Sequence, residues 1–446
     1  MKMKYLSILL FFILIVNCTF AGNYYVAPNG NDQNRGTKKS PFKSIMKAQE
    51  MVEPGDTVWL RGGIFHIKPN EISKKEKIYA IVFDLNKSGK EGTRICYFAY
   101  KNEKPIFELN EVRPVHYRVM VFDVTASWIY LKGIQVVGTQ VTIKTHTQSE
   151  CFHNEGNHNI YELLSMHDGM AIGFYLIKGS DNLILNCDAY RNWDNYSENG
   201  KGGNTDGFGC HPRLGGKGNV FRACRAWFNS DDGFDCIHAY ESVTFDHCWA
   251  FFNGFNTSFI SEGDGNGFKA GGWGKTAADN LPKSIPHHLI EFCVAAGNKA
   301  NGFYSNHQPG GSFWYNNTAY ENGTNFNMLN RLQDNKTDVA GYDHVLKNNL
   351  SYKPRTYETQ HIDSSKCDIS FNSFSLPIKI TKKDFISTDI SLLEAKRNPD
   401  GSLPNTGFLK PAPTASFIDK GMNIGYPFSG KAPDLGAFEQ TKKINP

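Results

Sequence analysis

The first part of the chain alternates short apolar stretches with turn residues. Residues 24–26 and 57–60 have the β-branched and aromatic content of short strands. Between them, residues 42–52 place apolar side chains on one helical face, after a possible cap at Ser40 and before a turn at 54–56. A single short amphipathic helix followed by many strands predicts a cap over the exposed end of a β-solenoid.

The middle of the chain repeats a six-residue pattern that begins with Cys or Asn and ends with Asn. The copies occupy residues 187–192, 224–229, 248–253, 293–298 and 317–322, with a worn copy at 349–352. Two intervals between copies are 24 residues, which sets the basic coil, and the longer intervals contain loops. A Gly-Phe pair follows several copies, beginning at positions 207, 233, 267 and 302.

Coils of this kind must stack, because no single coil can bury its own apolar face. Parallel strands of stacked coils lie about 4.8 Å apart, so equivalent residues form ladders. We expect an interior ladder of free thiols from Cys187, Cys224, Cys248 and Cys293. We expect an amide ladder at a tight turn, with Asn in the left-handed conformation, from Asn192, Asn229, Asn253, Asn298 and Asn322.

The repeat fades after about residue 353. Residues 433–438 resemble a closing strand that folds back on the solenoid, and no linker demands a second domain. The sequence therefore predicts one all-β catalytic domain over residues 22–446, a β-solenoid with a short N-terminal capping helix.

The first 21 residues have the pattern of an export signal. Lys2 and Lys4 precede an apolar run at 5–16 that is too short to span a bilayer, and Ala21 ends a possible cleavage site. Cys18 offers an alternative lipoprotein site. We expect an exported chain that is periplasmic, anchored at the cell surface or secreted, with no transmembrane span after processing.

Charge and composition limit the choice of partner. The 446 residues include 48 basic and 44 acidic side chains, a net charge of +4. This balance gives no reason to expect nucleic acid, so recognition depends on local clusters. We expect a monomer.

Four aspartates converge on two adjacent coils: Asp206, Asp231, Asp232 and Asp235. Such close carboxylates would repel one another and raise one another's pKa, which a bound hard cation would prevent. Oxygen ligands with several negative charges favour Ca²⁺ over zinc or copper. A single Asp-Gly would be interpreted as a turn, but this convergence predicts a calcium site.

Lys269 follows the third Gly-Phe pair, in the position that Gly209 and Asp235 occupy in the preceding coils. It should therefore face the aspartates, where a cation and partial burial would lower its pKa toward that of a general base. A base beside a cation suits β-elimination from a 4-linked galacturonate. The base removes the C5 proton, the cation stabilises the charge on the carboxylate, and the O4 leaving group departs.

Two other classes stay open. The aspartates include the paired carboxylates that a glycoside hydrolase needs. A non-catalytic solenoid that binds glycans is the second alternative. An unsaturated product and loss of activity with a chelator would distinguish a lyase from both.

The aspartates at 206, 231, 232 and 235, together with residues 267–269, resemble polysaccharide lyase family 9 over about residues 183–320. The resemblance implies a right-handed parallel β-helix, calcium held by the four aspartates and Lys269 as the Brønsted base. It also implies pectin, an acidic plant cell-wall polysaccharide, as the substrate. The family acts on homogalacturonan or on rhamnogalacturonan I, and both offer galacturonate to the same catalytic residues.

We favour rhamnogalacturonan I because aromatic side chains along the repeats would stack on its less charged rhamnose, although most should lie in the core or in turns. These aromatic residues are Tyr190, Trp193, Trp227, Trp249, Trp273, Tyr304 and Trp314. Candidate substrate contacts are Arg213, Asn301, Tyr304, His307 and Arg331.

Overall fold

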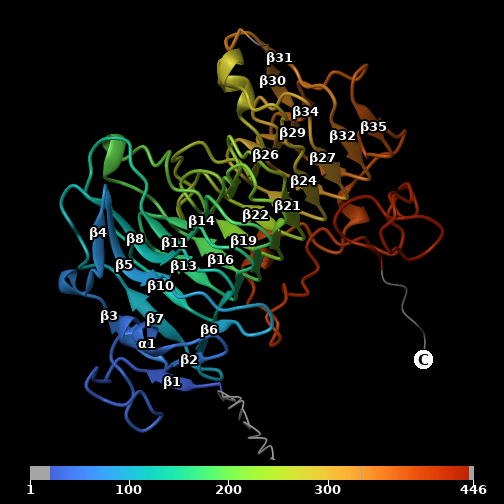
Figure 1. Cartoon of the computed structure of the whole chain (residues 1–446). Helices are drawn as coiled ribbons and strands as arrows, with labels where there is room; N and C mark the ends of the chain where they lie inside the picture. Colours follow the sequence, from blue (N-terminus) through green and yellow to red (C-terminus); the bar gives the residue numbers. More distant parts are fainter. Residues whose placement is uncertain (1–20, 333, 441–446) are drawn as a thin grey trace, which may run out of the picture.

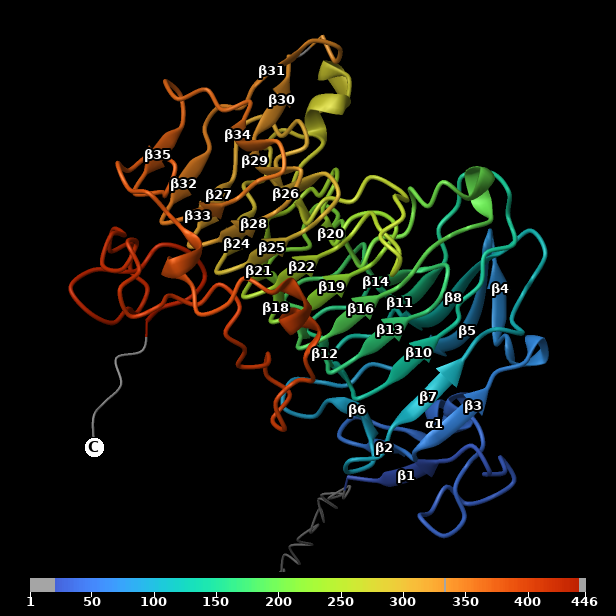
Figure 2. The same ribbon diagram turned by 180° about the vertical axis from the view of Figure 1, so that it is seen from behind.

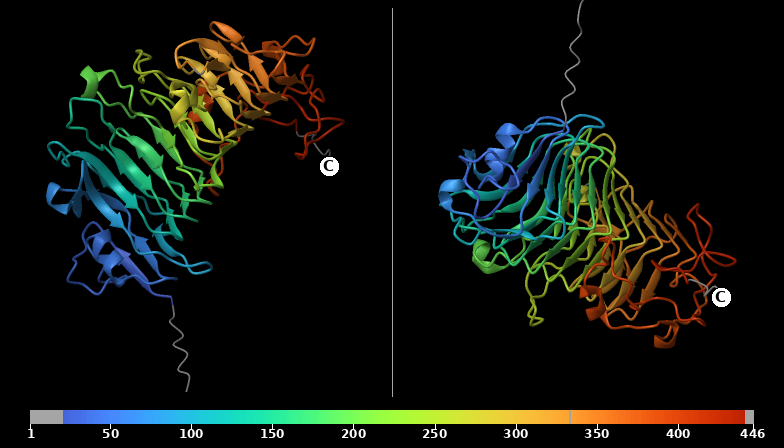
Figure 3. Two further views of the ribbon diagram at one scale, coloured as in Figure 1. Left: turned by 45° about the horizontal axis from the view of Figure 1, so that its top comes forward. Right: turned by 90° about the horizontal axis from the view of Figure 1, so that it is seen from below.

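The computed structural model describes residues 21–332 and 334–440. The predicted export signal, including Cys18, lies outside these residues except for Ala21. The described chain winds into an elongated stack of coils, each of which contributes a strand to three parallel sheets (Figures 1 and 3). This arrangement confirms the β-solenoid.

Sheet 1 has 12 strands. They are β1 (Asn23–Val26), β2 (Thr57–Leu60), β6 (Ile95–Ala99), β9 (Ile129–Lys132), β12 (Ile160–Glu162), β15 (Leu183–Leu185), β18 (Asn219–Arg222), β21 (Val243–Asp246), β24 (Leu289–Glu291), β27 (Phe313–Tyr315), β32 (Val345–Lys347) and β35 (Asp368–Ser370).

Sheet 2 has 10 strands. They are β3 (Gly63–His66), β7 (Pro105–Glu108), β10 (Gln135–Val137), β13 (Ser165–His167), β16 (Asp188–Tyr190), β19 (Arg225–Trp227), β22 (Trp249–Phe251), β25 (Val294–Ala296), β28 (Thr318–Tyr320) and β33 (Leu350–Tyr352).

Sheet 3 has 11 strands, which pair in parallel except for β4 with β5. They are β4 (Lys74–Glu76), β5 (Tyr79–Leu85), β8 (Arg118–Val124), β11 (Glu150–Asn154), β14 (Ile172–Leu176), β17 (Phe208–Cys210), β20 (Phe234–Asp235), β23 (Phe268–Lys269), β26 (Asn301–Tyr304), β29 (Thr324–Asn327) and β34 (Tyr357–Gln360). A separate antiparallel ribbon joins β30 (Leu329–Arg331) to β31 (Asp338–Ala340).

Helices are few and short. They are α1 (Ile45–Met51) and the 3₁₀ turns η1 (Pro69–Glu71), η2 (Ser197–Gly200), η3 (Trp273–Lys275), η4 (Ala278–Asn280), η5 (Lys382–Asp384) and η6 (Ile390–Glu394). In the part of the chain that the structure describes, none of them has the length and apolar content to cross a bilayer.

The capping helix α1 lies at the N-terminal end of the stack, against β1 and β5 (Figure 1). It begins later than the sequence suggested, because Ser44 and not Ser40 is its N-cap. The Ser44 hydroxyl accepts a hydrogen bond from the Lys47 amide at 3.1 Å. Phe42 is instead held in a β-bridge to Val26, which keeps the preceding residues extended.

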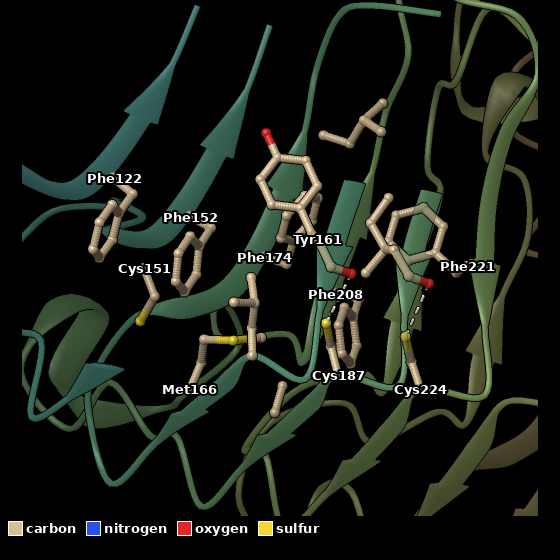
Figure 4. Close-up of a cluster of buried hydrophobic side chains, with 14 of the residues drawn as sticks. Phe122, Cys151, Phe152, Tyr161, Met166, Phe174, Cys187, Phe208, Phe221 and Cys224 are labelled. Atoms are coloured by element: carbon tan, nitrogen blue, oxygen red, sulfur yellow. Dashed lines mark hydrogen bonds between the residues drawn. The ribbon is translucent and has the colours of Figure 1, made fainter. Parts of the chain in front are cut away.

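The interior is built from ladders of equivalent side chains. Phenylalanines stack along sheet 3, with ring centroids 4.8 Å apart for Phe208 and Phe234 and 4.9 Å for Phe234 and Phe268. Figure 4 shows the same ladder beginning at Phe122 and Phe152, with Cys187 and Cys224 beside it. All nine cysteines of the described chain are free, as expected.

The amide ladder is confirmed, but its backbone geometry differs from the prediction. Each Asn donates through its side-chain amide to the next, at 3.1 Å from Asn229 to Asn253 and 3.0 Å from Asn253 to Asn298. The left-handed residue is the one before each Asn, such as Phe228 with φ 51°. The Asn itself must point inward to reach its neighbours, so the preceding residue makes the turn.

Residues 371–440 run back along sheet 2 as far as Asp188 on β16 and then return to β28 (Figure 2). No strand forms at 433–438, contrary to expectation, although Leu435 and Ala437 are buried against the solenoid. An ion pair stabilises the position of this segment: the Arg397 guanidinium lies 2.6 Å from Asp188 on β16.

The outer face of sheet 3 is a polar ladder. In each strand the residue after the buried Phe points outward, because side chains alternate along a strand. The register aligns Asp123 with His153, His153 with Tyr175, and Asp235 with Lys269. The fold therefore collects titratable side chains along one face.

His153 is a buried member of this ladder. Its Nδ1 atom lies 2.5 Å from Glu150 and its Nε2 atom 3.6 Å from Glu155. Burial lowers the pKa of His153, but Glu150 and Glu155 outweigh burial and raise the pKa to about 10. The imidazole is therefore charged at neutral pH.

Because the pKa of His153 is higher in the folded chain, its contribution to stability is complete below the unfolded value of about 6.5 and disappears as pH rises through 10. We expect the melting temperature of the wild type to fall more steeply between pH 7 and 10 than that of His153→Gln. The exposed control His146→Gln should follow the wild type. Parallel curves for wild type and His153→Gln would contradict this assignment.

Candidate active site

The Gly-Phe pairs bring the coils together at the start of β17, β20, β23 and β26 in sheet 3. A Cβ atom on Gly233 would lie 2.7 Å from the Gly267 carbonyl oxygen, and one on Gly267 would lie 2.6 Å from that of Gly302. Only glycine permits this approach. The Phe that follows points inward, so Asp235 and Lys269 point outward as direct neighbours, as their positions in the repeat predicted.

Lys269 is held between two carboxylates. Its Nζ atom lies 2.9 Å from Asp232 Oδ2 and 2.9 Å from Asp235 Oδ2. The lysine is 9% exposed and Asp232 is fully buried. Lys269 therefore lies in direct contact with two of the predicted aspartates, Asp232 and Asp235.

Three of the four predicted aspartates form a compact group. Asp206, Asp232 and Asp235 each offer an oxygen within 4.8 Å of the others. Asp231 is also buried, but it is not a member of this trio. Its Oδ1 atom accepts a hydrogen bond from the Asp264 amide at 3.1 Å.

One oxygen of each carboxylate is fixed by a backbone amide. The bonds are Asp232 N to Asp206 Oδ1 at 3.1 Å, Asp264 N to Asp231 Oδ1 at 3.1 Å, Asn266 N to Asp232 Oδ1 at 2.7 Å and Ile237 N to Asp235 Oδ1 at 2.7 Å. The orientation of every carboxylate is thus set by the main chain, which leaves its second oxygen for a ligand or for Lys269.

The site contains more negative than positive charge. Burial, followed by repulsion from the neighbouring carboxylates, raises the pKa of Asp206 and Asp231 well above the usual value. Burial also raises the pKa of Asp232, in spite of Lys269. For Asp235, burial acts in the same direction, but Lys269 and other neighbours hold its pKa below the usual value.

The pKa of Lys269 is well above the usual lysine value, opposite to the expected lowering. Burial does lower it, but attraction from Asp232 and Asp235 is stronger. A pKa of Lys269 below the usual value would require a bound cation that offsets the negative charge of the carboxylates.

A basic group lies beside the site, on the two coils after Lys269. Tyr304 is aligned with Lys269 across β23 and β26, and its ring meets His307 at 6.3 Å. Arg331 reaches His307 at 3.3 Å and Asp338 at 2.7 Å. Burial, then Lys275 and Arg331, lower the pKa of His307 to about 4. Three of the predicted substrate contacts, Tyr304, His307 and Arg331, are therefore adjacent.

The other two predicted contacts are placed differently. Arg213 is exposed in the turn after β17, and among the described residues its side chain makes no hydrogen bond or ion pair. Asn301 is bonded to two other asparagines: its Nδ2 atom donates to Asn266 and its Oδ1 atom accepts from Asn327.

The sequence interpretation missed Tyr175, His211 and Asn266. The rings of Tyr175 and His211 lie 5.1 Å apart on the N-terminal side of Asp235. Asn266 donates to Asp232 through both its backbone and its side chain. The repeat did contain a signal for two of them. Tyr175 directly follows a Phe, as Asp235 does, and Asn266 directly precedes a Gly-Phe pair, as Asp232 does.

The aromatic residues that suggested rhamnose stacking are mostly buried. Trp314 is fully buried, while Trp249 and Trp273 are 3% exposed. Trp227 stacks on Tyr190 at 4.1 Å, in the cluster beneath the C-terminal segment. These tryptophans belong to the core and do not form a sugar-binding surface.

Comparison with known proteins shows the family to which the chain belongs. Residues 24–349 match a family model described as a Pel9A-like right-handed β-helix region. A pectate lyase L from Dickeya dadantii is 34% identical over 94% of this chain and 90% of its own length.

Two solved structures are similar over most of their length. One named rhamnogalacturonan lyase has a TM-score of 0.85 and 45% identity, covering 88% of this chain and 97% of that one. Pectate lyase Pel9A has a TM-score of 0.76 and 32% identity, covering 94% and 96%. The stack of coils described above is thus a right-handed parallel β-helix, and the chain is a polysaccharide lyase that belongs to the Pel9A-like family.

Proposed function

We propose that the protein is a calcium-dependent lyase that cleaves the galacturonate-containing backbone of pectin by β-elimination, with rhamnogalacturonan I as the preferred polymer. The observation that carries the proposal is the group of four buried aspartates around one lysine. A hydrolase could use two carboxylates, but a base within ion-pair distance of a cluster with metal-ligand geometry is what elimination requires.

The donor set fits calcium. Asp206, Asp232 and Asp235 would be ligands through the oxygens that the backbone leaves free, and Asp231 would complete the negative shell. Hard carboxylate oxygens are the ligands that Ca²⁺ prefers. When bound, calcium would neutralise the substrate carboxylate and so acidify the C5 proton.

Lys269 would be the Brønsted base. Its Nζ atom would take the C5 proton, the C5–H electron pair would form the C4–C5 double bond, and the C4–O4 bond would break. The departing O4 would then take up a proton. Asp232 and Asp235 bind Nζ in this structure, and compensation of their charge by calcium would release it and bring the pKa of Lys269 down toward a working value.

The basic group would bind galacturonate carboxylates next to the reacting sugar. Arg331 supplies its positive charge, and the neutral His307 imidazole and the Tyr304 ring lie alongside. Arginine suits this role because its planar guanidinium matches a carboxylate.

The preference for rhamnogalacturonan I no longer rests on tryptophans. Its support is the higher identity to the solved rhamnogalacturonan lyase, 45%, than to pectate lyase Pel9A, 32%. A homogalacturonan lyase is the alternative within the same chemistry, since pectate lyases from Dickeya and Emericella nidulans cover 94% and 90% of the chain. The predicted export signal suits an enzyme that acts on a polymer outside the cell.

The test is digestion of rhamnogalacturonan I and homogalacturonan side by side, followed by the ultraviolet absorbance of the unsaturated product. We expect the faster rise with rhamnogalacturonan I, loss of activity with a chelator and recovery with added Ca²⁺. Lys269→Ala should lower kcat by about 10²–10⁴-fold, the usual contribution of a general base.

Lys39→Ala, which removes an exposed lysine at the far N-terminal end, is the matched control and should leave the rate unchanged. Faster cleavage of homogalacturonan would contradict the preference for rhamnogalacturonan I and leave the proposed lyase chemistry in place. Cleavage without an unsaturated product would favour a hydrolase, and an absence of cleavage of both polymers would contradict the proposal as a whole.

A further inference from the structure

The residue before each Gly-Phe pair forms its own ladder through the active site. In four successive coils this residue is Asp206, Asp232, Asn266 and Asn301. The stacking is direct, because Gly207 donates to the carbonyl of Asp232, Gly233 to that of Asn266 and Gly267 to that of Asn301, at 2.8–2.9 Å. Two carboxylates are thus continued by two amides at equivalent positions.

The amides are joined head to tail. Asn327 Nδ2 donates to Asn301 Oδ1 at 3.1 Å, and Asn301 Nδ2 donates to Asn266 Oδ1 at 2.7 Å. Asn266 Nδ2 then donates to Asp232 Oδ1 at 2.7 Å, beside the backbone bond of the same residue. Every donor points toward Asp232.

We propose that Asn266 and Asn301 are positioning residues for the metal centre, and that this amide relay fixes Asp232 so that its Oδ2 atom alone faces the cation and Lys269. The inference rests on the proposed function, since it assigns the relay to a calcium ligand. Two donors on Oδ1 hold the carboxylate plane, whereas among the described residues Asp206 receives a bond only from the backbone amide of Asp232.

The orientation of Asn266 is set by its neighbour. Asn301 offers both its backbone N–H, at 3.3 Å, and its side-chain amide to Asn266 Oδ1. The side-chain oxygen of Asn266 must therefore face Asn301, and the side-chain NH₂ group of Asn266 then points toward Asp232. Hydrogen bonds in such a chain polarise one another, so the last donor, to a carboxylate, gains most.

The relay differs from the structural amide ladders of the same fold. In the interior ladder, Asn253 Nδ2 also donates to the Ala226 carbonyl, which stabilises the coil itself. Within the part of the chain that the structure describes, the side chains of Asn266 and Asn301 donate no hydrogen bond to a backbone carbonyl. Asn301 also has both ends of its amide engaged, which argues against its predicted role as a substrate contact.

The decisive variant is Asn301→Asp. The new carboxylate oxygen is an acceptor and faces Asn266 Oδ1, which needs a donor. The side-chain amide of Asn266 must therefore rotate by half a turn or move away, and either change removes its hydrogen bond to Asp232. A simple charge effect has the opposite sign, because an added carboxylate near the site would strengthen calcium binding. The two explanations therefore predict opposite changes in one measured constant.

The experiment is calorimetric titration of the full chain with Ca²⁺ in the absence of polysaccharide. We expect Asn301→Asp to weaken calcium binding by about 10- to 100-fold, the usual effect of losing a partner that orients a metal ligand. Asn301→Ala, which removes the donor without adding an acceptor, should weaken it less. Asn349→Asp is the matched control: its amide belongs to a buried ladder bonded to Asn317 and Asn372, and calcium affinity should be unchanged.

Calcium affinity of Asn301→Asp that equals or exceeds the wild-type affinity would overturn the relay. So would a higher KM for polysaccharide with unchanged calcium affinity, which would return Asn301 to substrate binding. A wild type that binds no calcium would instead contradict the proposed function, so the two failures are distinguishable. Melting curves without calcium establish that each variant is folded.

Discussion

The parallel register between β20 and β23 is the constraint on which the active site depends. It places Asp235 and Lys269 side by side, although 34 positions separate them in the chain. The register is fixed from inside the helix, because Phe234 and Phe268 stack within it and a slip of one residue would exchange the inner and outer faces. The core therefore determines which side chains meet outside.

The same stacking creates an electrostatic problem. Four carboxylates that the coils bring together are buried with a single ammonium group, and burial of unbalanced charge is costly. The raised pKa values of Asp206 and Asp231 express that imbalance. Backbone amides fix one oxygen of each carboxylate, so the cluster cannot relieve its repulsion by turning outward. An oxygen-binding cation is the partner that this arrangement accommodates.

Much of this was predictable because a solenoid repeats its local rules. The spacing of the Gly-Phe pairs placed Lys269 over Asp235, and the cysteine and asparagine ladders followed from the six-residue repeat. Finer features were not predictable in the same way. The start of α1 depends on a β-bridge at Phe42, and the left-handed turn residue depends on the direction in which Asn253 and its neighbours point.

The remaining errors have physical causes of their own. A tryptophan in a strand fits the same sequence pattern whether its side chain contacts a sugar or packs in the core. Trp227 is buried because the C-terminal segment covers it, and the repeat does not predict that contact. The pKa of Lys269 depends on the balance between burial and four carboxylates, whose sign cannot be obtained from spacing. Asn266 was overlooked because an amide in a turn is common, and Asn301 was assigned to substrate binding. Only the hydrogen bonds connect the two residues to Asp232.

The central claim is that Asp206, Asp232 and Asp235 share a calcium ion next to Lys269. A crystal structure of the protein soaked in Ca²⁺, with anomalous scattering to identify the ion, tests it most directly. The account predicts a calcium peak bound by the three carboxylates, with the Lys269 ammonium no longer bridging Asp232 and Asp235. Calcium absent from this cluster, with both ion pairs of Lys269 intact, would contradict it.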